Sequence, residues 1–347
     1  MGHKSKLTES VLGREVRQAP DAVAAQRQPL MQPLQELVGR LSKKPPQVVV
    51  TCARGSSAHA ASFGKHLIER YLGIPVAPAA PVVATAYKRD LLLKDQLVIV
   101  VSQSGRSDDL IAQAVSARRA GAITAALVND VGSPLADVCE FILPIGAGPE
   151  ESVAATKSFI ASLSALLRLT ADWSAVRNLK DSVDRLPEHL VRAAQLDWTA
   201  AADGLVNPTG LIVIGRGPTL AIAREAALKL KETCGVQAEA YSGAEFMHGP
   251  VTLVTPGYPI LMFMPTDEAA AGMPKLADDL VVKGATVFTS ASEGAGESRL
   301  PTIKTGNAEA DAICLIQSFY GMMVRLAELR GMSPDRPRHL QKVTRTK

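Results

Sequence analysis

The sequence predicts an α/β protein built from two related domains in tandem, each a parallel β-sheet sandwiched between layers of helices. Three observations lead to this fold class. The chain has 347 residues, whereas a single hydrophobic core usually stops growing at about 250–300 residues. Hydrophobic residues make up 47% of the chain and aromatic residues only 4%, which is typical of aliphatic helices packed on parallel strands. The third observation is an internal repeat.

The repeat relates two segments in which a β-branched strand runs into Arg-Gly and then into a helix. Arg54 and Arg216 mark the two copies, 162 positions apart. The same offset carries Gly73 onto Gly235, and it carries the apolar stretch 98–101 onto a second apolar stretch. Agreement at several places without a large gap indicates an internal duplication.

Each copy alternates short apolar strands with helical stretches, as expected for βαβ units. The first copy predicts strands near 47–52, 96–102, 122–127 and 140–144, and helices near 57–72, 106–120 and 153–174. The second predicts strands near 210–215, 258–264 and 285–290, and helices near 219–234, 273–283 and 310–330. The expected divisions are a helical extension (1–45), a first domain (46–190), a linker (near 187–208), a second domain (208–330) and a C-terminal tail (331–347).

Composition narrows the class of protein. The net charge is +4, and much of the basic excess lies in the last dozen residues, whereas a nucleic-acid binder normally shows a denser basic patch. Four scattered cysteines form no metal or disulfide pattern, which predicts buried thiols in a reducing compartment. No apolar run reaches the roughly 18 residues of a membrane span. We therefore expect a cytoplasmic protein without metal, membrane or nucleic-acid partner.

A Ser-rich segment follows the predicted strand 96–102, where parallel sheets bind ligands beyond the strand ends. Its side chains could hold a phosphate together with two hydroxyls after the neighbouring strand; the candidates are Ser102, Gln103, Ser104, Ser107, Ser56 and Ser57. Such turns are also explained as simple helix N-caps. The duplicate favours a phosphate site in the first domain only, because the equivalent segment 264–267 lacks this hydroxyl density and ends in an aspartate.

Six motifs together resemble tandem sugar isomerase (SIS) domains. They lie at 54–57, 102–105, 153–157, 228–232, 248–250 and 337–342. The resemblance is to the isomerase half of glucosamine-6-phosphate synthase, also called glutamine-fructose-6-phosphate aminotransferase, and to stand-alone SIS-type glucosamine-6-phosphate deaminases. It implies that Val153 and Gln341 contact the substrate, and that no cofactor takes part.

The resemblance also assigns the chemistry. Glu232 and Lys229 share one helix face at i, i+3 spacing, and as a lone pair they would be an exposed ion pair of little worth. In the family, the glutamate equivalent to Glu232 moves a proton between C1 and C2 of the open-chain sugar. His248 is implied to open the sugar ring and to come from the neighbouring subunit, so that a homodimer is the active unit. Lys342 is implied to lie over the sugar, either as an imine former or as a positioning group.

The leading hypothesis is therefore a deaminase/isomerase that converts glucosamine 6-phosphate to fructose 6-phosphate and ammonia. The chain begins Met1-Gly2-His3 without the nucleophilic cysteine of a glutaminase, so we expect no glutamine hydrolysis here. Alternatives are a synthase-like aminotransferase working with free ammonia and an enzyme that processes galactosamine or fructosamine 6-phosphate. The alternative from another class of protein is a non-catalytic sugar-phosphate sensor. A sensor needs only the phosphate site, whereas this chain also retains Glu232, His248 and Lys342.

Overall fold

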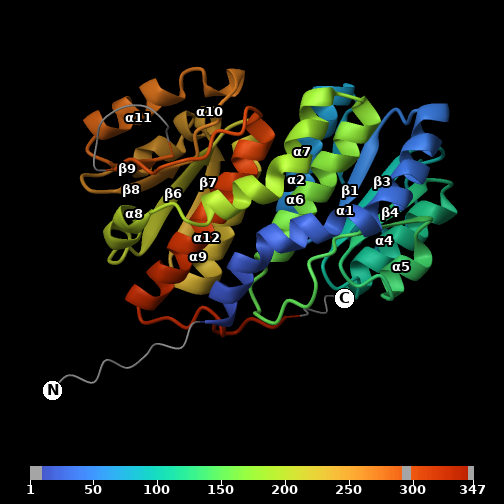
Figure 1. The fold of residues 1–347 in the computed structure, drawn as a ribbon, viewed down its shortest axis with the longest axis horizontal. Helices are drawn as coiled ribbons and strands as arrows, with labels where there is room; N and C mark the ends of the chain where they lie inside the picture. Colours follow the sequence, from blue (N-terminus) through green and yellow to red (C-terminus); the bar gives the residue numbers. More distant parts are fainter. Residues whose placement is uncertain (1–9, 291–297, 343–347) are drawn as a thin grey trace.

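Two parallel sheets lie side by side with helices packed between them (Figure 1). The computed structural model describes residues 10–290 and 298–342. The first sheet has the strand order β2-β1-β3-β4-β5 and the second β7-β6-β8-β9, and the paired strands run parallel in both. The predicted fold class of two tandem parallel-sheet domains is confirmed.

The first lobe holds five strands and most of the helices around them. Its strands are β1 (Val49–Cys52), β2 (Val76–Pro78), β3 (Leu97–Ser102), β4 (Ile123–Val128) and β5 (Phe141–Pro144). Its helices are α2 (Gly55–Leu72), α3 (Pro81–Thr85), α4 (Asp108–Arg119), α5 (Pro134–Val138), α6 (Lys157–Ser174) and α7 (Arg177–Ala193). Every residue of β1, β3 and β4 is buried, because helices cover both faces of a parallel sheet.

The second lobe repeats this strand order without a fifth strand. Its strands are β6 (Gly210–Gly215), β7 (Gln237–Ser242), β8 (Pro259–Met262) and β9 (Thr286–Thr289). Its helices are α8 (Thr199–Gly204), α9 (Pro218–Cys234), α10 (Gly243–Met247), α11 (Met273–Val282) and α12 (Ala308–Leu329), with 3-10 turns η1 (Pro250–Leu253) and η2 (Glu268–Ala270). Helices α2 and α9 both end at a glycine of positive φ, Gly73 and Gly235, so the sequence offset is also a structural one.

Some elements differ from the sequence-based expectation. Strands β2 and β7 were not expected, because β2 is three residues long and mostly exposed, and β7 has a polar sequence. The expected linker near 187–208 contains the end of α7 and the whole of α8. Pro187 hides the helical pattern of α7, which buries Leu179, Leu186 and Leu190.

The N-terminal extension is one long helix, α1 (Val11–Lys43). It packs against α6 and α7 and buries a stripe of leucines: Leu12, Leu30, Leu34, Leu37 and Leu41. The C-terminal tail leaves α12 and runs along one edge of the molecule toward the first lobe (Figure 1). The two ends of the described chain therefore lie near each other.

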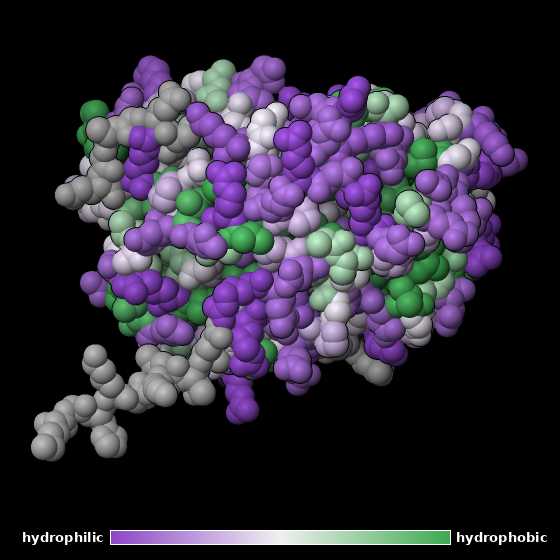
Figure 2. All heavy atoms as spheres, viewed as in Figure 1, coloured by the Kyte–Doolittle hydropathy of each residue, from purple (hydrophilic) through white to green (hydrophobic). Residues whose placement is uncertain are grey.

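Polar side chains cover most of the face shown in Figure 2, and apolar atoms appear there in small groups. Among the described helices, α12 has the length and apolar composition of a membrane span. It packs in the interior, where Phe319 and Tyr320 are fully buried and Phe319 packs against Phe263 of the second lobe. We attribute its apolar character to this core position.

Candidate active site

A cavity of about 360 Å³ opens at the carboxyl ends of β1 and β3, the part of an open parallel sheet where ligands bind. Both lobes and the tail line it. It brings together every predicted site residue except His248: Ser56, Ser57, Ser102, Gln103, Ser104, Ser107, Val153, Lys229, Glu232, Gln341 and Lys342. Residues far apart in sequence thus meet around one space.

The first-lobe wall of the cavity has the geometry of an anion site. Helix α2 begins at Gly55, directly after β1, so Ser56 and Ser57 lie in its first turn. Helix α4 begins after Ser107, and the loop before it starts at Ser102. Two helix N-termini with their hydroxyls therefore face the cavity, and free N–H groups with a favourable dipole stabilise a bound anion.

Gly105 makes the tight turn of this loop possible. Its φ is +62°, and a Cβ there would lie 2.0 Å from Ser133 Oγ, so no other residue fits without displacement. Its N–H donates to Ser102 Oγ at 3.0 Å, and the Arg106 N–H donates to Ser104 Oγ at 3.3 Å. The hydroxyls are thus fixed by the turn itself.

The charged residues beside the loop are paired with one another. Arg106 binds Asp130 at 2.8 Å, and Arg54 binds the buried Asp109 at 2.7 Å. Asp109 lies in the first turn of α4, where a carboxylate complements the helix dipole. A phosphate in the cavity would therefore be held mainly by hydroxyls and backbone N–H groups.

The opposite wall carries a buried cluster on one face of α9. Glu225, Lys229 and Glu232 follow at i, i+4 and i+7; Lys229 contacts Glu232 closely and its Nζ lies 3.6 Å from Glu225 Oε1. Only 1% of the Lys229 side chain is exposed, which rules out the alternative of an exposed ion pair. Burial alone would lower the pKa of Lys229, but Glu225 and Glu232 together outweigh it and raise that pKa.

Two further side chains fix Glu225, whose own side chain is fully buried. His59 Nδ1 lies 2.8 Å from one carboxylate oxygen, and the Tyr320 hydroxyl donates to the other at 3.2 Å. Burial, with Glu225 beside it, raises the pKa of Tyr320 well above its ordinary value. This network holds Lys229 firmly, and Lys229 in turn holds the Glu232 carboxylate at the cavity wall.

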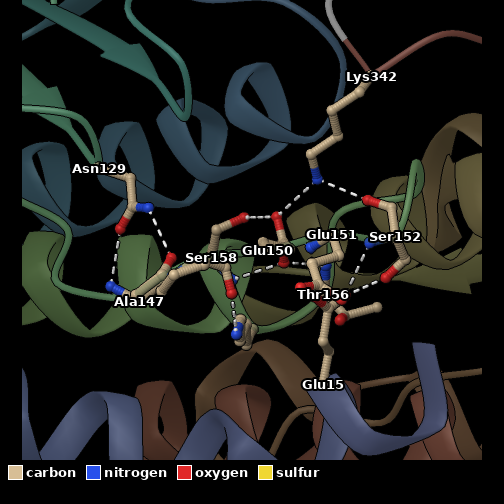
Figure 3. Close-up of polar contacts among 12 residues, drawn as sticks. Glu15, Asn129, Ala147, Glu150, Glu151, Ser152, Thr156, Ser158 and Lys342 are labelled. Atoms are coloured by element: carbon tan, nitrogen blue, oxygen red, sulfur yellow. Dashed lines mark hydrogen bonds and ion pairs between the residues drawn. The ribbon is translucent and has the colours of Figure 1, made fainter. Parts of the chain in front are cut away.

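The tail brings Lys342 to the cavity from the outside. Its Nζ donates to the Ser152 carbonyl at 2.6 Å and to Glu150 Oε2 at 3.3 Å (Figure 3). The Glu150 side chain is fully buried, whereas 28% of the Lys342 side chain remains exposed. A basic, Pro-interrupted tail would be expected to fray, yet these two contacts hold Lys342 beside the cavity.

His248 does not reach the cavity of its own chain. It follows α10, is exposed, and is absent from the cavity lining. Its supply by a neighbouring subunit stays a prediction.

Sequence reasoning missed Glu150, Glu225, His59 and Tyr320. Glu225 could have been found, because it lies two turns before Glu232 on the same helix face. Glu150 accepts a hydrogen bond from Lys342, 192 positions away, and no local sequence pattern predicts such a contact. His59 of α2 pairs with Glu225 of α9, in the other lobe.

The four cysteines are free and buried, as predicted. Burial raises the pKa of the Cys52 thiol to about 12 and that of Cys139 and Cys234 to about 11. Within the described ranges, no group of three or more His, Cys, Asp or Glu side chains has the arrangement of a metal site.

The SIS domain model matches residues 42–171 and 205–287, one segment in each lobe. The chain belongs to the SIS domain family. A glutamine–fructose-6-phosphate aminotransferase (isomerizing) from Thermococcus kodakarensis is 32% identical over 314 residues, which cover 85% of this chain and 51% of that protein. The chain thus spans about half the length of the curated relatives it matches.

Two solved SIS-fold structures extend the comparison. A protein from Silicibacter pomeroyi DSS-3, provisionally named a phosphosugar isomerase, is 41% identical with a TM-score of 0.90, covering 94% of this chain and all of its own. A glucosamine-6-phosphate deaminase from Thermotoga maritima is 23% identical with a TM-score of 0.73, covering 95% and 100%. At that identity, the second likeness shows the fold alone.

Proposed function

We propose that this SIS protein is a phosphosugar isomerase acting on an amino sugar, with glucosamine 6-phosphate as substrate and fructose 6-phosphate and ammonia as products. One observation carries the proposal: Glu232, paired with a buried lysine, lines the same cavity as the hydroxyl-rich loop of the first lobe. A phosphate at the loop would leave the sugar chain running toward Glu232. A carboxylate there suits proton transfer between neighbouring carbons.

The reaction balances with water as co-reactant. After ring opening, Glu232 takes the C2 proton of the open-chain aldehyde, and the electrons of that C–H bond form a C1=C2 enolamine as the aldehyde oxygen gains a proton. Return of the proton to C1 leaves an imine at C2. Water adds to this imine carbon, the C–N bond breaks, and ammonia leaves with the ketose as the other product. Lys229 favours the step by holding the Glu232 carboxylate in place beside it.

The subunit arrangement belongs to the same proposal. His248 would assist ring opening, because an imidazole exchanges protons near neutral pH. Its exposure on the surface of its own chain supports delivery to the cavity of a second copy. The active unit would then be a homodimer.

A direct assay tests the reaction. Purified protein with millimolar glucosamine 6-phosphate should release ammonia and fructose 6-phosphate in equal amounts. Glu232→Gln should abolish turnover while leaving fructose 6-phosphate binding largely intact, and Glu328→Gln, on an exposed position of α12, serves as the matched control. Full activity of Glu232→Gln would exclude it as the base.

A second candidate is the reverse use of the same site, in which free ammonia and fructose 6-phosphate yield the amino sugar. The match to proteins named as aminotransferases supports it. Incubation with ammonium and fructose 6-phosphate measures this direction. Galactosamine and fructosamine 6-phosphates in the same assay test the neighbouring substrate classes, and tight binding without any product would identify a sensor.

A further inference from the structure

The start of α1 and the described part of the C-terminal tail meet near the candidate active site. Asp335, in the tail, accepts hydrogen bonds from the Val11 N–H at 3.0 Å and from the Leu12 N–H at 2.8 Å. These N–H groups open α1 and have no partner within the helix, and a carboxylate at that position also complements the helix dipole. Asp335 therefore fixes the tail to the start of α1 shortly before Lys342.

The same helix reaches the loop that receives Lys342. Glu15 is only 4% exposed, and its carboxylate accepts hydrogen bonds from the Glu151 N–H and from the N–H and hydroxyl of Ser152. The carbonyl of Ser152 accepts from Lys342 Nζ at 2.6 Å. Figure 3 shows this continuous path from α1 through Ser152 to the lysine.

The loop itself has little freedom. Glu150 accepts hydrogen bonds from the Thr156 and Ser158 N–H groups at 3.0 and 3.1 Å and from the Ser158 hydroxyl at 2.7 Å. Val153, between these anchors, lines the cavity. One turn beyond Glu15, Gln18 accepts from Lys157 Nζ at 2.8 Å, so α1 holds the loop at two points.

We propose that Glu15 and Asp335 are positioning residues for Lys342, so that α1 is a working part of the active site. Neither carboxylate lines the cavity, and both act through groups that do. A free lysine side chain loses rotamer entropy when it is fixed, and a misplacement of about 1 Å can cost about a hundredfold in rate. The anchor at Asp335 and the anchor of the receiving loop at Glu15 remove this freedom before substrate arrives. The proposal rests on the proposed function, in which Lys342 lies over the sugar.

Hydrogen exchange on the ligand-free protein tests the anchors without any reaction. Asp335→Asn should speed amide exchange at 336–342, and Glu15→Gln should speed it at 150–156 and 340–342, while exchange in β3 and β4 stays unchanged. Asp278→Asn and Glu36→Gln, both at exposed positions, should change neither region. Unaltered exchange in both variants would refute the anchors.

Kinetics then test positioning against mere stability. Each variant should lower kcat by about tenfold, equal to about 1.4 kcal/mol, with little change in KM. In a Lys342→Met background the same substitutions should cost nothing more, because their effect passes through the lysine. An equal loss in that background refutes the proposal while leaving the proposed function intact. If the unaltered protein turns over no sugar phosphate, the proposed function fails instead, and the role of both residues falls with it.

Discussion

Replacement of Lys229 by methionine tests the buried cluster of α9. The substitution keeps the volume of the side chain and removes one ammonium between two carboxylates, one of which, Glu225, is fully buried. Removing one partner of a buried ion pair leaves an uncompensated charge and costs about 3–5 kcal/mol. We expect Lys229→Met to lower the free energy of unfolding by that amount at pH 8.

The magnitude depends on burial, so an exposed lysine supplies the control. Lys275 pairs with Asp279 at 2.7 Å in the same i, i+4 arrangement, but 78% of its side chain is exposed. Lys275→Met should cost at most about 1 kcal/mol. Urea denaturation followed by circular dichroism measures both variants. A difference between them below about 1 kcal/mol would refute the account of Lys229 as the counter-ion of the cluster.

The pH dependence of this difference gives an independent check. In the unaltered protein the pKa of Lys229 is raised by its carboxylate partners against the effect of burial, so its stabilisation is fully present below the ordinary lysine pKa of about 10.4 and is lost only as pH rises beyond it. Between pH 5 and 8 this contribution is therefore constant. In Lys229→Met, a proton taken up by a carboxylate relieves the unpaired charge, so the penalty should shrink as pH falls from 8 to 5.

Three shorter predictions concern the rest of the site. Gly105→Ala should destabilise the protein by at least about 1 kcal/mol more than Gly148→Ala. Both glycines have positive φ, but only a Cβ at Gly105 would clash, lying 2.0 Å from Ser133 Oγ. Equal unfolding midpoints would contradict the clash. The four cysteines should resist a disulfide reagent at pH 8 in the native state and react fully in urea, since burial raises their pKa values. If His248 acts in the neighbouring subunit, inactive Glu232→Gln and His248→Asn variants should complement each other when they are mixed and their subunits exchange. Ammonia release should then return to about a quarter of full activity. No recovery despite exchange would place the histidine in its own site.

The sequence predicted every described strand except one edge strand of each sheet, β2 and β7. Strands β3 and β6 are continuous apolar runs, and such runs are buried on both faces. Strand β2 has the sequence Val-Ala-Pro with two exposed residues, and its pairing with β1 depends on neighbours that only the fold supplies. Short, exposed edge strands leave little trace in a local pattern.

The site residues also divide into those that a sequence motif marks and those that only the fold brings into place. The hydroxyl loop was predicted from a local motif at the end of a strand, and Glu232 was predicted from the family resemblance of its helix. The residues that hold them, such as Glu225 and Glu15, act through contacts between distant elements. Their burial as charged groups is the physical mark of their role, and burial becomes visible only in three dimensions.

The predicted duplication also bears on why we expect a phosphate site in one lobe only. The offset of 162 that relates the lobes makes Arg70 the first-lobe residue equivalent to Glu232. Arg70 lines a second cavity of about 790 Å³ at the end of β8. There its guanidinium binds Glu309 at 2.9 Å and Glu268 at 3.2 Å and contacts Asp267 closely. A phosphate dianion entering this cavity would meet Asp267 in the segment equivalent to the hydroxyl loop of the first lobe, and Arg70 is already paired with carboxylates. We therefore expect the chain to bind one sugar phosphate.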